Sequence, residues 1–262
     1  MKLGIRFATL LAVMMVRATV VCADTVQLNP VADTTLIETV PNNNLGGQNH
    51  VNAGTTQNFT KNHGLFRFDL SGAIPSDAVV TSVMLQLEVT RQPVDGFAAA
   101  TFELHRVLLP WGEGDKVSTP LAPGLGAPAT LNEATWNHRF AGTSETWAAP
   151  GGLAGTDFAA TASATQVVYD VGNSPYIFGS SAELINDVTY WLANPESNFG
   201  WMLVTQNEGV DFTARRFGSR EDTVNAPILT IQFEVVPEPG TMALLVAGVV
   251  VWVMARRRLA PH

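Results

Sequence analysis

The chain has 262 residues, a formal net charge of −8 and a single cysteine. The acidic total argues against nucleic acid as a partner, because nucleic-acid binding relies on a dense positive surface that displaces counterions. One cysteine excludes an internal disulfide, so we expect buried apolar side chains to stabilise the fold.

Residues 1–23 have the layout of a secretory signal peptide. Lys2 and Arg6 precede an apolar run that Arg17 ends, and the segment closes with Val21-Cys22-Ala23. We predict a signal helix that is cleaved after Ala23. Lipidation of Cys22 is the alternative, but the residue before this cysteine is not the small one that a lipoprotein signal has.

Residues 24–235 show the pattern of a single all-β domain, with no linker dividing it. Strict alternation of apolar and polar residues occurs at 66–70, 82–90 and 229–235. This period of two is typical of strands with one face toward a core and one toward water. Further strands are expected at 34–38, 101–108, 165–171, 199–205 and 212–217. Many short strands with turn signals between them indicate a β-sandwich.

One segment departs from this pattern and predicts a short helix. Its apolar residues recur at helical spacing: Leu184, Ile185, Val188, Trp191 and Leu192. Ser181 can cap the N-terminus, and Pro195 follows the end. We expect this helix to close one end of the sandwich by packing.

The region 110–152 is rich in glycine and proline and has little periodicity. A structureless loop of this length is uncommon in a compact domain. We therefore expect an ordered excursion that Trp111, Trp136 and Trp147 pin against the sheets.

The tail, residues 236–262, has three parts. Pro237-Glu238-Pro239 is followed by an uninterrupted apolar run over 241–255 and then by Arg256, Arg257 and Arg258. The run would span about 22 Å as a helix at about 1.5 Å per residue, and the arginines can extend it toward the cytoplasmic face. We predict a C-terminal transmembrane helix with the domain outside. A buried core helix is the alternative, against which the arginines and the prolines argue.

This three-part tail, opened by VPEPGT at 236–241, resembles the PEP-CTERM sorting signal of Gram-negative bacteria. The resemblance implies that a membrane exosortase recognises the tail and that the protein is exported to the cell surface or an extracellular polysaccharide matrix.

The domain itself resembles DNRLRE domains, also classed as carbohydrate-binding module family 96. The segments that carry the likeness are ADT at 32–34, PNNNLGG at 41–47, LFRFDLS at 65–71, IP at 74–75, ATWN at 134–137 with Trp147, PGG at 150–152, FGSRE at 217–221 and PILT at 227–230. The resemblance implies a jelly-roll β-sandwich, secretion and binding to a polysaccharide, with alginate as the usual ligand. The family signature is present here as its tail, Ser219-Arg220-Glu221.

Two groups of side chains suit an acidic glycan. Indole faces stack on sugar rings, which makes Trp111, Trp136 and Trp147 candidates, although packing is the favoured interpretation of all three. Guanidinium groups bind carboxylates, and the candidates are Arg139, Arg215, Arg216 and Arg220. A structural ion pair between Arg220 and Glu221 is the alternative for the last of these.

Hard oxygen ligands for calcium are available from Asp33, Asn42 and Asn44 near a glycine-rich turn. Such turns need no metal, because asparagine tolerates left-handed backbone conformations and caps its own backbone. A structural calcium ion is therefore one of two interpretations.

Catalysis finds little support in the sequence. The histidines of the domain, His50, His63, His105 and His138, lack the spacing of zinc ligands, and no nucleophile elbow or phosphate loop is present. We expect a noncatalytic domain that binds polysaccharide through a sheet face or the tryptophan-bearing loop. A structural surface protein with protein partners is the second hypothesis, and a polysaccharide lyase or hydrolase is the third.

Overall fold

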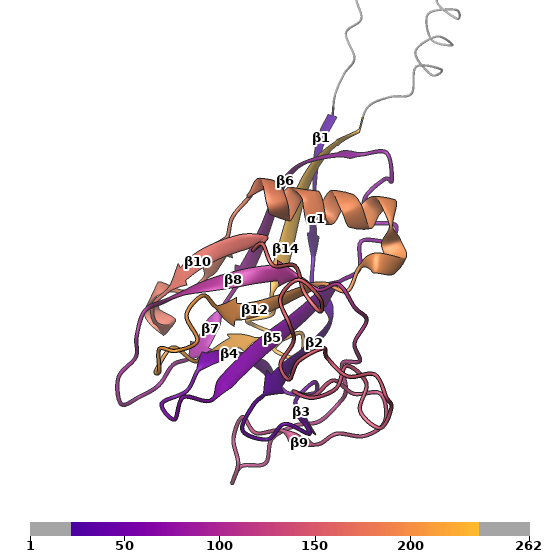
Figure 1. Ribbon diagram of the computed structural model, residues 1–262. Coiled ribbons are helices and arrows are strands. Elements are labelled where there is room, and N and C mark those ends of the chain that lie inside the picture. Colours follow the sequence, from indigo (N-terminus) through magenta and orange to yellow (C-terminus); the bar gives the residue numbers. More distant parts are fainter. Residues whose placement is uncertain (1–21, 236–262) are drawn as a thin grey trace, which may run out of the picture.

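The computed structural model describes residues 22–235, and Figure 1 shows how their strands are arranged. The smaller sheet has the strand order β1–β14–β6–β11, and every pairing in it is antiparallel. The bounds of its strands are β1 Cys22–Leu28, β14 Ile228–Val235, β6 Val79–Leu87 and β11 Tyr176–Phe178.

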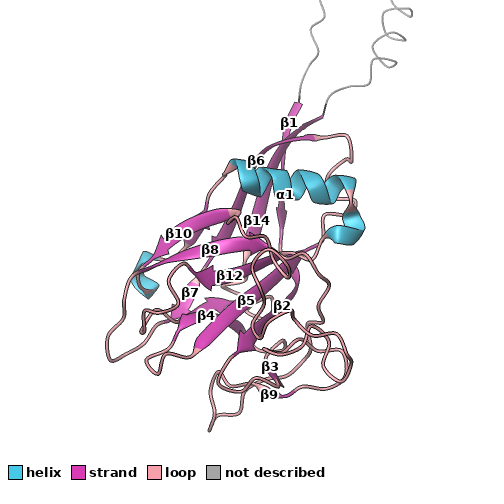
Figure 2. Cartoon of the chain, in the orientation of Figure 1, coloured by secondary structure: helices cyan, strands magenta, loops and turns pink. Residues whose placement is uncertain are grey.

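The larger sheet has the order β10–β8–β12–β5–β4–β13–β7, and β2 pairs with β5 off this path. Its bounds are β10 Ala164–Val168, β8 Ala100–Arg106, β12 Trp201–Thr205, β5 Lys61–Phe68, β4 His50–Thr55, β13 Arg215–Gly218, β7 Val89–Arg91 and β2 Pro30–Ile37. The sheet curls, as Figure 2 shows. A two-stranded ribbon joins β3 Asn43–Asn44 to β9 Ala127–Pro128.

The predicted all-β class is confirmed, with one α-helix in the described residues, whereas the jelly-roll connection stays a prediction. The predicted signal helix and transmembrane helix fall outside residues 22–235, except that Cys22 and Ala23 already belong to β1. Cleavage after Ala23 would leave the rest of β1 paired with β14. Between residues 22 and 235, no helix is long and apolar enough to cross a membrane.

The alternation at 82–90 places apolar side chains in the core, as predicted. Val83, Leu85 and Leu87 of β6 are fully buried, and the residues between them are half-exposed. Each such burial contributes about 1.5–3 kcal/mol. The run does not form one strand, however: β6 lies in the smaller sheet and β7, which follows Glu88, lies in the larger one. The chain therefore crosses from one sheet to the other within this segment.

The main core lies between the two sheets and is closed by α1, Ala182–Ala193. Both sheets contribute, for example Phe66 and Phe102 from the larger and Ile231 from the smaller. The Ser181 hydroxyl caps the helix by accepting a hydrogen bond from the Leu184 amide at 3.0 Å. The helix, its cap and its apolar face are confirmed. Two 3₁₀ turns complete the helical elements, η1 Val171–Asn173 and η2 Pro195–Ser197.

The outer face of the larger sheet is also covered, which the alternation did not predict. Leu65 of β5 points away from the main core and is nevertheless fully buried, in a second apolar cluster with Trp111, Trp136 and Trp147. The expected ordered excursion at 110–152 is therefore confirmed. The predicted alternation at 66–70 also holds, with Arg67 half-exposed and Asp69 exposed, and the cover over β5 begins at Leu65, just before that run.

Candidate functional site

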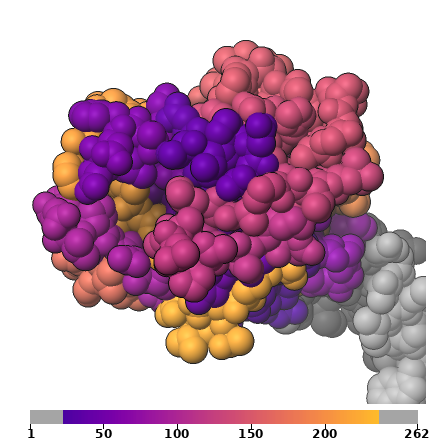
Figure 3. Space-filling view, turned by 90° about the horizontal axis from the view of Figure 1, so that it is seen from below, coloured from indigo at the N-terminus to yellow at the C-terminus, as the bar shows by residue number. Residues whose placement is uncertain are grey.

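An open groove lies along β4, β13 and β7 and has a volume of about 500 Å³. Loop 56–60, loop 91–93 and loop 123–125 form its walls, and Figure 3 shows the hollow with an orange floor between purple and pink segments. The residues that line it are Ile37, Thr39, Asn52, Thr56, Gln57, Asn58, Thr60, Asn62, Arg91, Gln92, Pro93, Pro123, Gly124, Leu125, Ala214, Arg215 and Arg216. Amide side chains are the most frequent polar group in this lining.

A second hollow of about 270 Å³ continues the groove. It shares Pro123, Gly124 and Arg216 with the first hollow. His50 and the loop around Ser118 form the rest of its lining. Strand pairing explains this continuity, because β13 pairs with β4 on one side and with β7 on the other. We call the two hollows together the β4–β13–β7 groove.

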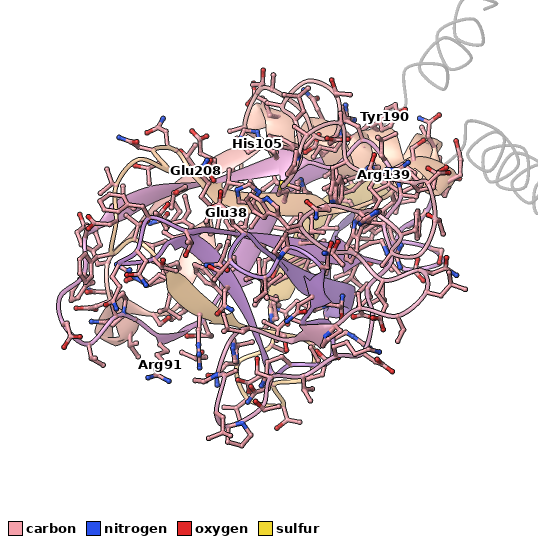
Figure 4. The ribbon with its side chains drawn as sticks, turned by 60° about the horizontal axis from the view of Figure 1, so that its bottom comes forward. Glu38, Arg91, His105, Arg139, Tyr190 and Glu208 are labelled. Atoms are coloured by element: carbon pink, nitrogen blue, oxygen red, sulfur yellow. The ribbon has the colours of Figure 1, made fainter. Side chains whose placement is uncertain are left out.

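Two guanidinium groups stand in this groove without a carboxylate partner in residues 22–235. Arg216 of β13 and Arg91 of β7 are Cα partners across the strand pair, and neither forms an ion pair or a side-chain hydrogen bond there. Partial burial, and then the charge of Arg91, hold the pKa of Arg216 below its usual value. Figure 4 places Arg91 at the lower edge of the molecule, well away from Arg139.

His50, at the second hollow, carries a buried polar atom that is unsatisfied within residues 22–235. Its ring is 7% exposed, and its Nδ1 lies 3.1 Å from the Asn49 Oδ1, whereas Nε2 has no hydrogen-bond partner. Burial, followed by the charges of Arg216 and Arg91, lowers the pKa of His50 to about 4. The neutral imidazole therefore predominates near pH 7.

The three tryptophans proposed as a sugar platform do not offer their faces to solvent. Trp111, Trp136 and Trp147 are 3%, 6% and 3% exposed, so the packing alternative describes them. The indole nitrogens of Trp111 and Trp147 donate to the carbonyls of Phe199 and Thr135 at 2.8 and 2.9 Å. A side chain at Gly151 would lie only 2.5 Å from the Trp136 ring, which explains the glycine in the PGG segment.

Of the four candidate arginines, only Arg216 lines the groove with a guanidinium group that has no hydrogen-bond or ion-pair partner in residues 22–235. Arg139 donates to the Pro110 carbonyl and pairs with Glu145. Arg220 pairs with Glu113 and Glu221, which confirms the ion-pair alternative. These contacts fix loops within the domain.

Arg215 is 1% exposed, and each of its three guanidinium nitrogens donates to main-chain carbonyls. The acceptors are the carbonyls of Ala98, Tyr169, Phe212, Thr213 and Ala214. Arg215 therefore ties three segments together at the end of the sandwich, and it is not free to bind a ligand.

The oxygen atoms proposed for calcium serve as hydrogen-bond acceptors inside the fold. The Asp33 carboxylate accepts from the Arg220 amide at 2.7 Å, and burial raises its pKa well above the usual value. The Asn44 Oδ1 accepts from the amides of Gly46 and Lys116, and the Asn42 Oδ1 accepts from Asn137. These residues do not fit a calcium site, and within residues 22–235 no three His, Cys, Asp or Glu side chains gather to hold a metal.

Sequence reasoning missed Arg91 and His50, which complete the groove. Arg91 is separated from Arg216 by 125 positions, and His50 belongs to a strand whose residues are all buried, so that it shows no alternation. The one available signal was the pair Arg215-Arg216, because successive residues of a strand point to opposite faces.

The similarity to known proteins that was found lies in the tail. The model of the PEP-CTERM protein-sorting motif matches residues 235–258, which confirms the predicted motif with Pro237, Glu238, Pro239 and the arginines at 256–258. No curated protein matches the chain. The match overlaps the β domain at Val235 alone, so the DNRLRE resemblance stays a prediction. The chain carries a PEP-CTERM sorting motif, which implies an exported protein that an exosortase sorts.

Proposed function

We propose that this exported protein is a noncatalytic surface or matrix protein that binds a polysaccharide in the β4–β13–β7 groove. The observation that carries the proposal is the row of amide side chains along an open groove, namely Asn52, Gln57, Asn58, Asn62 and Gln92. Each amide offers both donors and an acceptor, which matches the mixed hydrogen bonding of sugar hydroxyls. The volume of about 500 Å³ lies in the range of ligand sites.

The position of the groove supports the same proposal. Cys22 and Val235 are Cα partners, so the two ends of the described residues lie side by side. Figure 1 places β4 and β7 toward the other end of the molecule. The groove therefore lies away from Cys22 and Val235, on a side of the domain that a polymer in the surroundings of the cell could approach.

Exposed apolar side chains occur next to lining residues of the groove, in positions from which they could pack on the C–H faces of sugars. Phe59, Val94 and Leu121 are 61%, 84% and 99% exposed, and each lies in, or next to, a loop that lines the groove. Phe59 also has a φ of +58°, which is rare for an aromatic residue and costs about 1 kcal/mol or more. A strained, exposed aromatic ring suits a contact with a ligand better than it suits stability.

Replacing Phe59 by asparagine should stabilise the protein and weaken glycan binding. Asparagine tolerates a positive φ, so we expect the free energy of unfolding to rise by about 1 kcal/mol. Loss of the ring should lower polysaccharide affinity several-fold. Leu131→Asn is the matched control, since Leu131 is also exposed but its neighbours in the chain do not line the groove, whereas Asn58 and Thr60 on either side of Phe59 do. Unchanged affinity in Phe59→Asn would remove Phe59 from the proposed site.

Affinity electrophoresis of the full chain through gels that contain acidic or neutral polysaccharides tests the proposed function. The DNRLRE resemblance implies an acidic glycan such as alginate, and the guanidinium groups in the groove suit such a polymer. We expect retardation by at least one polysaccharide and no shortening of the polymer. Absence of retardation by every polymer would favour a structural surface protein with protein partners, whereas product release would indicate a lyase or hydrolase.

A further inference from the structure

We propose that His50, Arg91 and Arg216 form a binding site for the acid group of a polysaccharide, and that a proton joins His50 when this group binds. The inference rests on the proposed function and locates where in the groove the acid group of the polymer, a carboxylate or a sulfate ester, would bind. The site comprises the second hollow and the adjoining part of the first, on β4, β7 and β13.

The arginine pair supplies the first argument. Like charges directly opposite each other on neighbouring strands are destabilising. Arg91 and Arg216 are such a pair, and no carboxylate in residues 22–235 neutralises either of them. Gly124 keeps the space beside Arg216 open, because a side chain there would come within 3.1 Å of the guanidinium. An anion in this space would be bound by two charge-assisted donors and would relieve the repulsion.

The protonation state of His50 supplies the second argument. The Asn49 Oδ1 accepts hydrogen bonds from the Gln48 side chain and faces the Nδ1 of His50. The neutral ring therefore carries its proton on Nδ1. The buried Nε2 is then an acceptor to which no group in residues 22–235 donates a hydrogen bond. Buried polar atoms normally have a partner. Protonation turns Nε2 into a donor, and an oxyanion in the hollow would then accept its hydrogen bond.

The charges around His50 show that the counter-charge must come from a ligand. Arg216 on β13 and Arg91 on β7 are the charged groups that act on it. Loop 118–124, which forms the facing wall, contributes no titratable side chain. The nearest strands do contain carboxylates, but Asp33 of β2 accepts from the Arg220 amide, and Glu88 beside β7 accepts from the Gln86 amide.

Proton linkage turns this arrangement into a measurable pH dependence. Burial and the two arginines hold the pKa of His50 at about 4 in the free protein. Burial persists when an anion binds, but the negative charge opposes the two arginines and accepts a hydrogen bond from the protonated ring, so the pKa of His50 rises and binding takes up a proton. Affinity for the acidic polymer should then rise about tenfold as the pH falls from about 7 to about 5.

Affinity electrophoresis of the full chain at several pH values tests the site. The gels contain a polyuronate, a sulfated polysaccharide or a neutral polysaccharide. We expect Arg91→Gln and Arg216→Gln each to lose about tenfold in affinity for the acidic polymer that binds. His50→Gln should lose the gain in affinity that the wild type shows as the pH falls. Arg67→Gln, a change outside the groove, is the charge-matched control and should match the wild type.

The NMR titration of the His50 Cε1 proton in the full chain separates failure of the site from failure of the proposed function. The resonance is assigned by its loss in His50→Gln. We expect a pKa near 4 without ligand and a higher pKa with inorganic sulfate or with the acidic polymer. Equal retention by neutral and acidic polymers, with no effect of the arginine variants, overturns the acid site and leaves polysaccharide binding intact. Retention by no polymer overturns the proposed function, and an unchanged His50 pKa in sulfate overturns the site itself.

Discussion

Arg215→Met is expected to lower the free energy of unfolding by about 4 kcal/mol. The guanidinium group is buried and donates to five main-chain carbonyls, three of them in residues 212–214 and the others at Ala98 and Tyr169. Methionine fills much of the same volume but donates no hydrogen bond. Buried carbonyls would lose their partners, and the segments that Arg215 joins would separate more easily.

Denaturation in urea, followed by tryptophan fluorescence, measures this effect. Arg216→Met is the matched control, because it removes the same side chain at the next position of β13. Arg216 makes no hydrogen bond to a carbonyl and faces the charge of Arg91, so its loss should change stability by about 0.5 kcal/mol or less. Equal effects of the two substitutions would contradict the role assigned to Arg215.

Asn44→Asp should cost about 3 kcal/mol, although the two side chains have the same shape. The Asn44 amide nitrogen is fully buried and faces the carbonyls of Glu113 and Ala134 at 2.6 and 2.9 Å. An aspartate would place a carboxylate oxygen against these acceptors. Because Asn44 joins β3 to the excursion at 110–152, that excursion should loosen as well.

This substitution also separates the hydrogen-bonding role of Asn44 from the calcium interpretation. A calcium site would tolerate or prefer an added carboxylate. We expect thermal denaturation of Asn44→Asp to show the same loss with and without calcium. Asn42→Asp, an exposed change nearby, should stay within about 0.5 kcal/mol of the wild type. If calcium restored the thermal stability of Asn44→Asp, the interpretation of this turn as a calcium site would be supported.

Strands with one wet face could be predicted from the sequence, whereas strands buried on both faces were recognised unevenly: β12 was expected at 199–205, but others were missed. β14 and β6 alternate because their outer faces meet solvent, and α1 was recognised by its spacing and cap. β4 is buried along its whole length, and β2 nearly so, because other segments cover both faces. Burial on both faces removes the period of two, so that β4 was missed and β2 was only partly recognised.

The candidate site was harder to predict because it depends on tertiary contacts. The sequence singled out tryptophans and arginines by residue type, and most of these became buried supports for the excursion and the loops. Which arginine remains free is decided by the face of β13 on which it lies and by the carbonyls around it. Period two separates Arg215 from Arg216, but the register with Arg91 and the position of His50 follow only from the folded sheet.

The location of the polysaccharide site is tested most directly by mapping backbone amide shifts of the protein as an acidic polysaccharide is added. The account predicts that the perturbed amides cluster in four segments: 48–62, 91–93, 118–125 and 214–216. Perturbation centred on the buried tryptophans of the excursion, or on the outer face of the β1–β14 sheet, would contradict a polysaccharide site in the β4–β13–β7 groove.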